Sequence, residues 1–305
     1  MSIKHNIPLD VPQLQKSDYE KNFELATQGT GRLMLFAGDQ KVEHLNNDFY
    51  GEGIAKDDAD PEHMFKIADK ARIGIFATQL GLVAQYGMDY KNIPYLVKLN
   101  SKTNLVKKDQ MDPRSQSWFT VEDIMKFKKS SSLNIVGVGF TVYSGSEYEG
   151  EMLHEAAQAV FRAHQNGLFT VLWMYPRGNA VLDEKDPHLV AGAAGVAATL
   201  GADFVKVNYP KPKEGDRPTA LKEAVTACGR TKLICAGGSS IGVKEFLQQL
   251  HDQIHISGAS GNATGRNIHQ KPLEEAIRFA NAVSALTLDD MTVDQAFAIY
   301  DKKIK

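Results

Sequence analysis

Short apolar, β-branched runs recur along the chain and predict eight buried strands. The runs carry few polar interruptions, which is typical of parallel strands that are covered on both faces. The predicted strands are Arg32–Asp39, Ile73–Thr78, Tyr95–Asn100, Asn134–Tyr143, Phe169–Tyr175, Asp203–Tyr209, Lys232–Gly237 and Ile254–Ala259.

Longer segments with helical periodicity lie between these runs, and several begin with capping signals. Pro61–Ala71 follows Asp60 and has proline at its first position, and Thr120–Lys129 opens with a capping-box pattern, Thr-x-x-Asp. The other predicted helices are Glu151–His164, Pro187–Leu200, Pro218–Ala227, Val243–His251 and Pro272–Ser284, with Ser17–Ala26 and Val293–Lys303 flanking the array.

The repeated alternation of strand and helix predicts parallel βα units, and eight such units close a barrel. We therefore expect an α/β fold, a single (β/α)8 TIM barrel with extra N- and C-terminal helices. Within one domain of 305 residues, we assign a helical extension to 1–30, the barrel to 31–285 and a C-terminal helix to 286–305. The segment Ser101–Phe119 is the one long loop.

Composition and charge narrow the class of protein. The net charge is −2, which implies no general attraction to nucleic acid or to a membrane surface. Cys228 and Cys235 are the only cysteines, which fits a reducing compartment better than a disulfide framework. The first residues contain no apolar signal core, so we expect a cytoplasmic protein.

Unusual polar residues and glycines gather at the carboxyl ends of six of the eight predicted strands. This is where chemistry collects in such barrels. The residues are Asp39, Lys98, Asn100, Trp173, Tyr175, Lys206, Asn208, Gly237, Gly238, Ser257 and Gly258.

Lys206 lies within a predicted strand that is otherwise apolar. One interpretation is a structural lysine that reaches the strand end or pairs with Asp39. The other is a nucleophile, because burial lowers the pKa of a lysine and frees the amine to condense with a carbonyl. Lys98 competes with Lys206 for that role, or assists it by repulsion between like charges.

Three residues near the end of the fifth predicted strand have open roles. Tyr175 is either a core tyrosine or a general acid/base. Trp173 is expected to form a wall of the pocket. Arg177 either holds a phosphate or pairs with an acidic side chain.

Glycine-rich loops follow the seventh and eighth predicted strands. Loops at these positions often bind phosphate through backbone N–H groups and a helix N-terminus. The first loop contains Gly237, Gly238 and Ser239, and the second contains Gly265 with Arg266 as a potential bidentate donor. The alternative is a pair of tight turns that need glycine.

Two possible metal sites are disfavoured. His251 and His255 have the spacing of a zinc motif, but we assign them to a helix end and to the eighth strand, so they would not share a face. Asp39, Glu43 and His44 are expected to line a polar pocket rather than to bind metal.

The order and spacing of short motifs resemble those of archaeal-type class I fructose-bisphosphate aldolases, a family of Schiff-base TIM-barrel enzymes with related phospho-sugar aldolases and thiolases. The likeness extends from about Arg32 to Gln270. The matching pieces are Gly38–His44, Val138–Ser146, Trp173–Gly178, Gly201–Lys206, Ala236–Gly238 and Gly265–Gln270.

The resemblance implies a metal-independent aldolase that needs no cofactor and cleaves fructose 1,6-bisphosphate to dihydroxyacetone phosphate and glyceraldehyde 3-phosphate. It also implies a homo-oligomer. Lys206 would form the imine, Tyr175 would act as acid/base, and Asp39 would contact the substrate or relay protons. The remaining expected site residues are Trp173, Lys98, Arg177 and His44 around the substrate, and Gly237, Gly238, Ser239, Gly265 and Arg266 around phosphate.

Two departures from the family pattern leave the second phosphate without an assigned site. The family usually has Asp-His-Gly where this chain has Asp39-Gln40-Lys41, and often proline and lysine where this chain has Ser239-Ser240. Lys41 or Lys244 could substitute for the missing lysine. The open alternatives are a related phospho-sugar aldolase or thiolase, a metal-dependent aldolase or isomerase, and a non-catalytic sugar-phosphate sensor.

Overall fold

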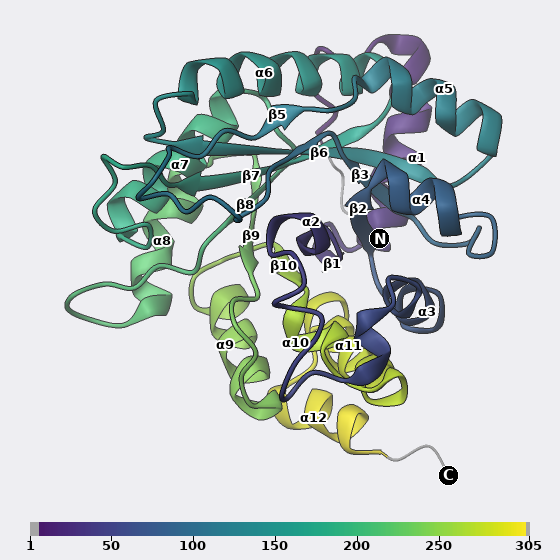
Figure 1. Cartoon of the computed structure of the whole chain (residues 1–305), viewed down its shortest axis with the longest axis vertical. Coiled ribbons are helices and arrows are strands. Elements are labelled where there is room, and N and C mark those ends of the chain that lie inside the picture. The colour runs from purple at the N-terminus through teal and green to yellow at the C-terminus, as the bar shows by residue number, and fades with distance from the viewer. Residues whose placement is uncertain (1–5, 303–305) are drawn as a thin grey trace.

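The computed structural model describes residues 6–302, and eight parallel strands close into a barrel (Figure 1). Around the barrel the strands neighbour one another in the order β1-β10-β9-β8-β7-β6-β3-β2. The predicted TIM barrel is therefore confirmed. The barrel strands are β1 (Leu33–Ala37), β2 (Ile75–Gln79), β3 (Tyr95–Lys98), β6 (Ile135–Ser144), β7 (Phe169–Pro176), β8 (Phe204–Val207), β9 (Lys232–Ala236) and β10 (Gly261–Thr264).

Helices surround the barrel, and all nine predicted helices are present with small shifts of their ends. The helices are α1 (Lys16–Thr27), α2 (Gln40–Glu43), α3 (Glu62–Lys70), α4 (Leu80–Tyr86), α5 (Val121–Ser131), α6 (Glu149–Gln165), α7 (Pro187–Thr199), α8 (Arg217–Ala227), α9 (Val243–His255), α10 (Arg266–His269), α11 (Leu273–Leu288) and α12 (Val293–Asp301). Lys303, the last residue of the predicted final helix, lies outside the described residues. Among the described residues, no helix has the length and apolar character needed to cross a membrane.

The predicted eighth strand, Ile254–Ala259, is wrong. Ile254 belongs to α9, where it shares a buried helix face with Phe246 and Leu250 at intervals of four residues. The strand that closes the barrel is β10, which begins after this helix and pairs with β1 and β9. The apolar run therefore reflects helical periodicity.

The same correction applies to the histidine pair. His251 and His255 both lie in α9, with ring centroids 4.4 Å apart, so the predicted split between helix and strand is wrong. His251 contacts Asp252, and His255 lies 3.5 Å from Asp290. Within residues 6–302, no three His, Cys, Asp or Glu side chains are grouped to hold a metal.

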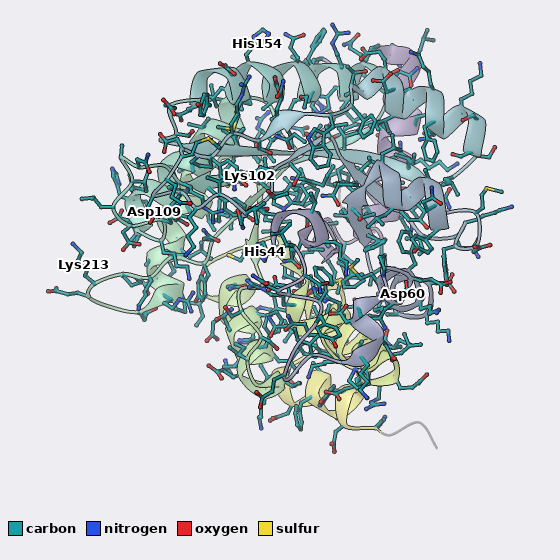
Figure 2. All side chains as sticks on the ribbon, viewed as in Figure 1. His44, Asp60, Lys102, Asp109, His154 and Lys213 are labelled. Carbon is teal, nitrogen blue, oxygen red and sulfur yellow. The ribbon has the colours of Figure 1, made fainter. Side chains whose placement is uncertain are left out.

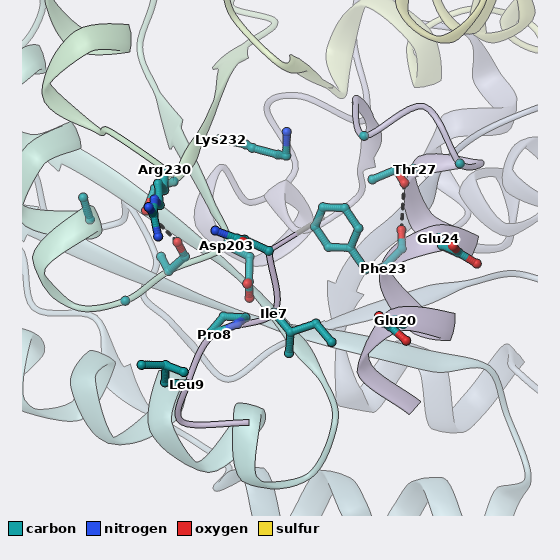
Figure 3. A pocket seen from close by; sticks show the side chains of 17 residues that line it. Ile7, Pro8, Leu9, Glu20, Phe23, Glu24, Thr27, Asp203, Arg230 and Lys232 are labelled. Carbon is teal, nitrogen blue, oxygen red and sulfur yellow. Dashed lines mark hydrogen bonds between the residues drawn. The ribbon is translucent and has the colours of Figure 1, made fainter. Parts of the chain in front are cut away.

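Helix α1 closes the amino end of the barrel. Phe23 of α1 packs against Phe204 and Phe169, with ring centroids 5.5 Å and 6.1 Å away. A pocket of about 690 Å³ also opens at this end, lined in part by Phe23, Asp203 and Lys232 (Figure 3). It adjoins the beginnings of β8 and β9, whereas the residues predicted to be catalytic lie at or near the strand ends.

A buried ionic cluster fixes α1 and the N-terminal segment to this end. Asp203, just before β8, accepts hydrogen bonds from the Thr170 amide (2.7 Å), from His164 Nε2 (3.0 Å) and from the Tyr19 hydroxyl. His164 Nδ1 lies 2.8 Å from Asp10. Although burial opposes protonation of His164, the two carboxylates raise its pKa to about 9.

β3 ends at Lys98, two residues before the predicted strand end, and β4 (Asn100–Ser101) pairs antiparallel with β5 (Gln116–Ser117) within the predicted long loop. Asn100 fastens this segment to the barrel, because its side-chain amide donates to Thr141 O and Ser115 O, both at 2.8 Å. Lys102 of this segment and His44 are seen toward the middle of the molecule in Figure 2, while Lys213 marks an outer loop.

Candidate active site

Two buried lysines face one tryptophan at the carboxyl end of the barrel. Lys206 on β8 is the register partner of Trp173 on β7, and its Nζ lies 5.0 Å from the indole centroid. Lys98, at the end of β3, places its Nζ 3.9 Å from the same ring. Exposed fractions are 4% for Lys206 and 2% for Lys98, so both ammonium groups are removed from bulk water.

Burial favours the neutral amine at both positions. The pKa of Lys206 lies below its ordinary value because of burial, with opposing effects from Asp39 and Glu43. Burial and the nearby charge of Lys206 lower the pKa of Lys98 to about 8. The predicted proximity of the two amines is thus present, and at both positions burial shifts the equilibrium toward the neutral amine.

Hydrogen bonding distinguishes the two lysines. The Nζ of Lys98 donates to the Thr141 hydroxyl on β6. Within residues 6–302, Lys206 Nζ has no hydrogen bond or ion pair, and the structural pairing with Asp39 considered above does not form. The hydrogen bond to Thr141 tethers the Lys98 amine, whereas the Lys206 amine is free to turn toward a substrate carbonyl, which favours Lys206 as the nucleophile.

Tyr175 lies two residues beyond Trp173 on β7 and is also buried. Burial raises the pKa of its phenol well above the ordinary value, and the charges of Glu43 and Asp39 add to this effect. The phenol therefore keeps its proton at neutral pH. A protonated phenol beside an amine can deliver a proton to a carbon attached to the resulting imine.

Asp39 follows β1 and precedes the short helix α2. It is 6% exposed, and its buried Oδ1 has no hydrogen-bond partner among the described residues. Gln79 fixes the backbone at this point through a 3.0 Å hydrogen bond to Asp39 O. A buried carboxylate oxygen without a partner is suited to accept a proton from a substrate hydroxyl.

The segments that follow β9 and β10 are joined by the side chain of Asn267. Asn267 Nδ2 donates to Gly237 O and Ser239 O, both at 3.1 Å, and its Oδ1 accepts from the Ile241 amide. Gly238 has φ +71°, which requires glycine, whereas the Gly237 amide is already bonded to Ala263 O at 2.9 Å. Gly237 therefore shapes the loop without offering a free N–H group.

Arg266 is only loosely paired. Its Nε lies 3.6 Å from Asp48 Oδ2 and makes no hydrogen bond among the described residues. Gly265 beside it is required by close packing, because a Cβ atom there would lie 2.7 Å from Ala37 O. This arrangement leaves a guanidinium with unused donors next to the glycine loops.

Other predicted contributors are engaged elsewhere. His44 pairs with Asp48, so Asp39, Glu43 and His44 do not converge. Lys41 donates to Ala59 O at 3.2 Å, and Lys244 pairs with Asp294 at 3.1 Å. Neither lysine stands free as a substitute for the missing phosphate lysine.

The contacts that join Glu43 to Tyr143 and Arg177 were not predicted, although Glu43 was expected in a polar pocket and Arg177 at the substrate. Glu43 Oε1 accepts from the Tyr143 hydroxyl at 2.8 Å and lies 3.4 Å from Arg177 Nη1. Arg177 also bonds to Glu184 at 3.1 Å and lies over the rings of Tyr143 and Tyr175. Glu43 and Tyr143 do occur in the sequence motifs, but their contact joins the segment after β1 to β6, with β2 and β3 lying between them in the barrel.

Comparison with known proteins identifies the family. The model of the DeoC/LacD family aldolases matches residues 33–271. The chain belongs to this aldolase family. A Methanocaldococcus jannaschii member, named fructose-bisphosphate aldolase/6-deoxy-5-ketofructose 1-phosphate synthase, is 59% identical over 96% of this chain and 94% of its own.

Solved structures place the chain within the Schiff-base branch of the family. A fructose-bisphosphate aldolase from Slackia heliotrinireducens is 56% identical, covers 99% of this chain and 96% of its own, and superposes with a TM-score of 0.96. An archaeal fructose-1,6-bisphosphate aldolase, solved with its catalytic Lys bound to the substrate carbinolamine, is 31% identical over 88% and 99% of the two chains, with a TM-score of 0.76. The present chain is therefore a class I aldolase, a lyase.

Proposed function

We propose that this class I aldolase reversibly cleaves fructose 1,6-bisphosphate to dihydroxyacetone phosphate and glyceraldehyde 3-phosphate through an imine on Lys206. The observation that carries the assignment is the buried Lys206 amine, which has no hydrogen-bond partner among the described residues and lies beside the Trp173 ring. The names of the relatives support the same substrate.

The steps follow from the chemistry of the side chains. Lys206 Nζ adds to the C2 carbonyl, and loss of water gives an iminium ion. Asp39 accepts the C4 hydroxyl proton, the C3–C4 bond breaks, and its electron pair moves into the iminium to form an enamine. Glyceraldehyde 3-phosphate leaves, Tyr175 protonates C3, and water hydrolyses the imine to release dihydroxyacetone phosphate.

The neighbours of β8 in the barrel suggest the direction in which the substrate would lie. With C2 on Lys206 of β8, the C1 phosphate would lie toward β9 and β10, where the glycine loops and Arg266 meet. The carbon chain from C4 to C6 would then extend toward β7 and β6, past Tyr175. This orientation assigns Arg266 and Gly238 to one phosphate and leaves the other end to the Arg177 region.

Trapping the imine tests this assignment. Borohydride added with dihydroxyacetone phosphate should attach one triose to the peptide that bears Lys206, as measured by mass spectrometry. Lys98→Met should still give the adduct, and Lys206→Met should abolish it. An adduct on Lys98, or none at all, would remove Lys206 from the role.

A second activity is supported by the name of the Methanocaldococcus jannaschii relative, with 59% identity over 96% of this chain. In 6-deoxy-5-ketofructose 1-phosphate, the C3–C4 bond joins a dihydroxyacetone phosphate unit to 2-oxopropanal. We propose that the same Lys206 enamine adds to that unphosphorylated aldehyde. Incubation of the protein with fructose 1,6-bisphosphate and 2-oxopropanal should yield the deoxyketose phosphate, and its absence would limit the chain to the first reaction.

We also propose that the chain acts in the cytoplasm as a homo-oligomer, in glycolysis or gluconeogenesis. The two free, buried cysteines are compatible with a reducing compartment. Light scattering of the purified protein tests the oligomer, since a particle mass equal to the 33.6 kDa of one chain would contradict it.

A further inference from the structure

The acceptor end of the site is the end where the aldehyde half of the substrate, C4 to C6, would lie. Its charge differs from that of the end near Arg266, where the C1 phosphate would lie. The inference below rests on the proposed function. Arg177 is the arginine at the acceptor end, and its side chain is 23% exposed. Arg177 and Arg266 both act electrostatically on Tyr175, so the phenol lies within the influence of a guanidinium from each end.

Two carboxylates hold Arg177. Glu184 Oε2 lies 3.1 Å from its Nε, and Glu43 Oε1 lies 3.4 Å from its Nη1. By contrast, Arg266 has one carboxylate neighbour among the described residues, Asp48 at 3.6 Å. A phosphate approaching Arg177 therefore meets a guanidinium that is already neutralised, whereas one approaching Arg266 meets unused donors.

Glu43 is held in this position from both sides. Helix α2 carries it over the middle of the barrel opening (Figure 1), and the Tyr143 hydroxyl donates to it from β6 at 2.8 Å. Its backbone oxygen accepts a hydrogen bond from the Asn104 amide at 2.9 Å. The side chain of Glu43 is 15% exposed, so its charge acts in a partly desolvated space.

Two lysines also lie at this end, and they differ in how they are paired. Lys108 is paired with Glu184 at 2.6 Å. Lys102 donates to the uncharged Asn104 side chain at 2.7 Å and remains the lysine to receive a second phosphate. Removal of Glu43 would thus leave Arg177, beside Lys102, with Glu184 as its carboxylate partner, and Glu184 is shared with Lys108.

We propose that Glu43 determines acceptor specificity: by neutralising Arg177, it allows unphosphorylated aldehydes to compete with glyceraldehyde 3-phosphate at one active site. A site with a free Arg177 would bind the phosphorylated aldehyde preferentially. With Glu43 in place, the preference for the phosphorylated aldehyde is weaker, so 2-oxopropanal can also react as the acceptor. Glu43 acts here through Arg177 as a positioning residue.

The test compares two acceptors in the condensation direction, with dihydroxyacetone phosphate as donor. In Glu43→Gln, which keeps the size of the side chain, the ratio of kcat/KM for glyceraldehyde 3-phosphate to that for 2-oxopropanal should rise roughly tenfold. The rise should come mainly from a lower KM for the phosphorylated aldehyde, because the interaction exists in the ground state. An unchanged or lower ratio would overturn the proposal.

A double-mutant comparison with Arg177 distinguishes an electrostatic role of Glu43 from a purely structural one. Arg177→Leu should lower kcat/KM more for glyceraldehyde 3-phosphate than for 2-oxopropanal, whether or not Glu43→Gln folds. In the Arg177→Leu background, adding Glu43→Gln should change the ratio much less than it does in the native chain. An equal effect in both backgrounds would show that Glu43 does not act through Arg177.

Two controls complete the design. Glu122 pairs with Arg162 at 2.6 Å on the outer surface, so Glu122→Gln removes a comparable carboxylate–arginine pair and should leave the ratio unchanged. Borohydride trapping with dihydroxyacetone phosphate separates the two proposals. If Lys206 is labelled and the ratio does not move, the specificity proposal alone fails; if Lys206 is not labelled, the proposed function fails and this inference fails with it.

Discussion

Lys98 and Lys206 lie against one indole, and this arrangement is costly for the folded protein. Each amine is removed from water, and each would carry a positive charge in the unfolded chain at neutral pH. The hydroxyl of Thr141 and the indole face compensate only partly. The buried amines thus lower the stability of the fold but are more reactive than exposed ones, a combination that is common at catalytic sites.

Replacement of Lys98 by methionine should therefore stabilise the protein at neutral pH. The pKa of Lys98 is about 8 in the folded state, below the ordinary value of 10.5, so the folded state bears the cost of charging this amine below pH 8. The cost is about 3 kcal/mol at most and disappears as the pH rises from 8 to 10.5. Urea unfolding should show a gain of ~1–3 kcal/mol at pH 7 that is lost near pH 10.5. A gain that is independent of pH would contradict this explanation.

Tyr175 is expected to matter for turnover and not for imine formation. In Tyr175→Phe, the ring still fills the site but no proton reaches C3, so kcat should fall by ~10²–10⁴. Borohydride should still trap dihydroxyacetone phosphate on Lys206 in this variant. Turnover close to that of the native chain would exclude Tyr175 as the acid.

At the scale of secondary-structure elements, the pattern of apolar residues predicted seven of the eight barrel strands and all nine expected helices. It missed β10, which lacks large apolar residues. β10 has the sequence Gly-Asn-Ala-Thr and is buried by its neighbours, not by its own hydrophobicity. Ile254 was assigned to a strand because its run is short and apolar, although it continues the buried face of α9. Tertiary context decides both cases.

Candidate site residues could be predicted from the sequence where they lie on strands or just beyond a strand end. Lys206, Tyr175 and Asp39 follow from their positions at strand ends, which the count of strands supplies. Glu43 could not be assigned a partner, because its contact with Tyr143 spans 100 residues and depends on where α2 crosses the mouth. The short helices α2, α4 and α10 likewise follow their strands too closely to give a periodic signal.

The cluster at the amino end should make stability depend on pH. The pKa of His164 is raised from 6.5 to about 9, so the charged ring stabilises the fold fully below pH 6.5 and loses this effect as the pH rises through 9. His164→Gln should cost on the order of 3 kcal/mol at pH 6, and the difference from the native chain should shrink by pH 9.5. Thermal unfolding at several pH values measures this, and a constant difference would show that packing alone matters.

At the scale of the whole molecule, the barrel separates its two ends. The amino end is closed by α1 and the His164 cluster, and the carboxyl end holds the proposed chemistry around α2. Residues near the two ends of β8, Asp203 and Lys206, therefore have different tasks. Asp203 is hydrogen-bonded within the fold, whereas Lys206 is the lysine that we propose to carry the reaction.

The two thiols should report on global unfolding. Cys228 and Cys235 are each 1% exposed, and burial raises the pKa of both, that of Cys228 to about 11. A thiol reagent should label neither in the folded protein, and labelling in denaturant should follow the loss of helical circular dichroism. Rapid labelling of one thiol in native buffer would reveal local opening of the barrel wall.

Trp173 also gives the protein an optical reporter of its own chemistry. The chain has two tryptophans, and Trp118 is 45% exposed, so its emission should stay constant and red-shifted. Trp173 lies beneath Lys98 and Lys206, and the charge and bonding of Lys206 would change if it forms the proposed imine. The blue part of the emission spectrum should therefore change on mixing with dihydroxyacetone phosphate, and this signal should be lost in Lys206→Met. Stopped-flow recording of that change would time the covalent step without any label.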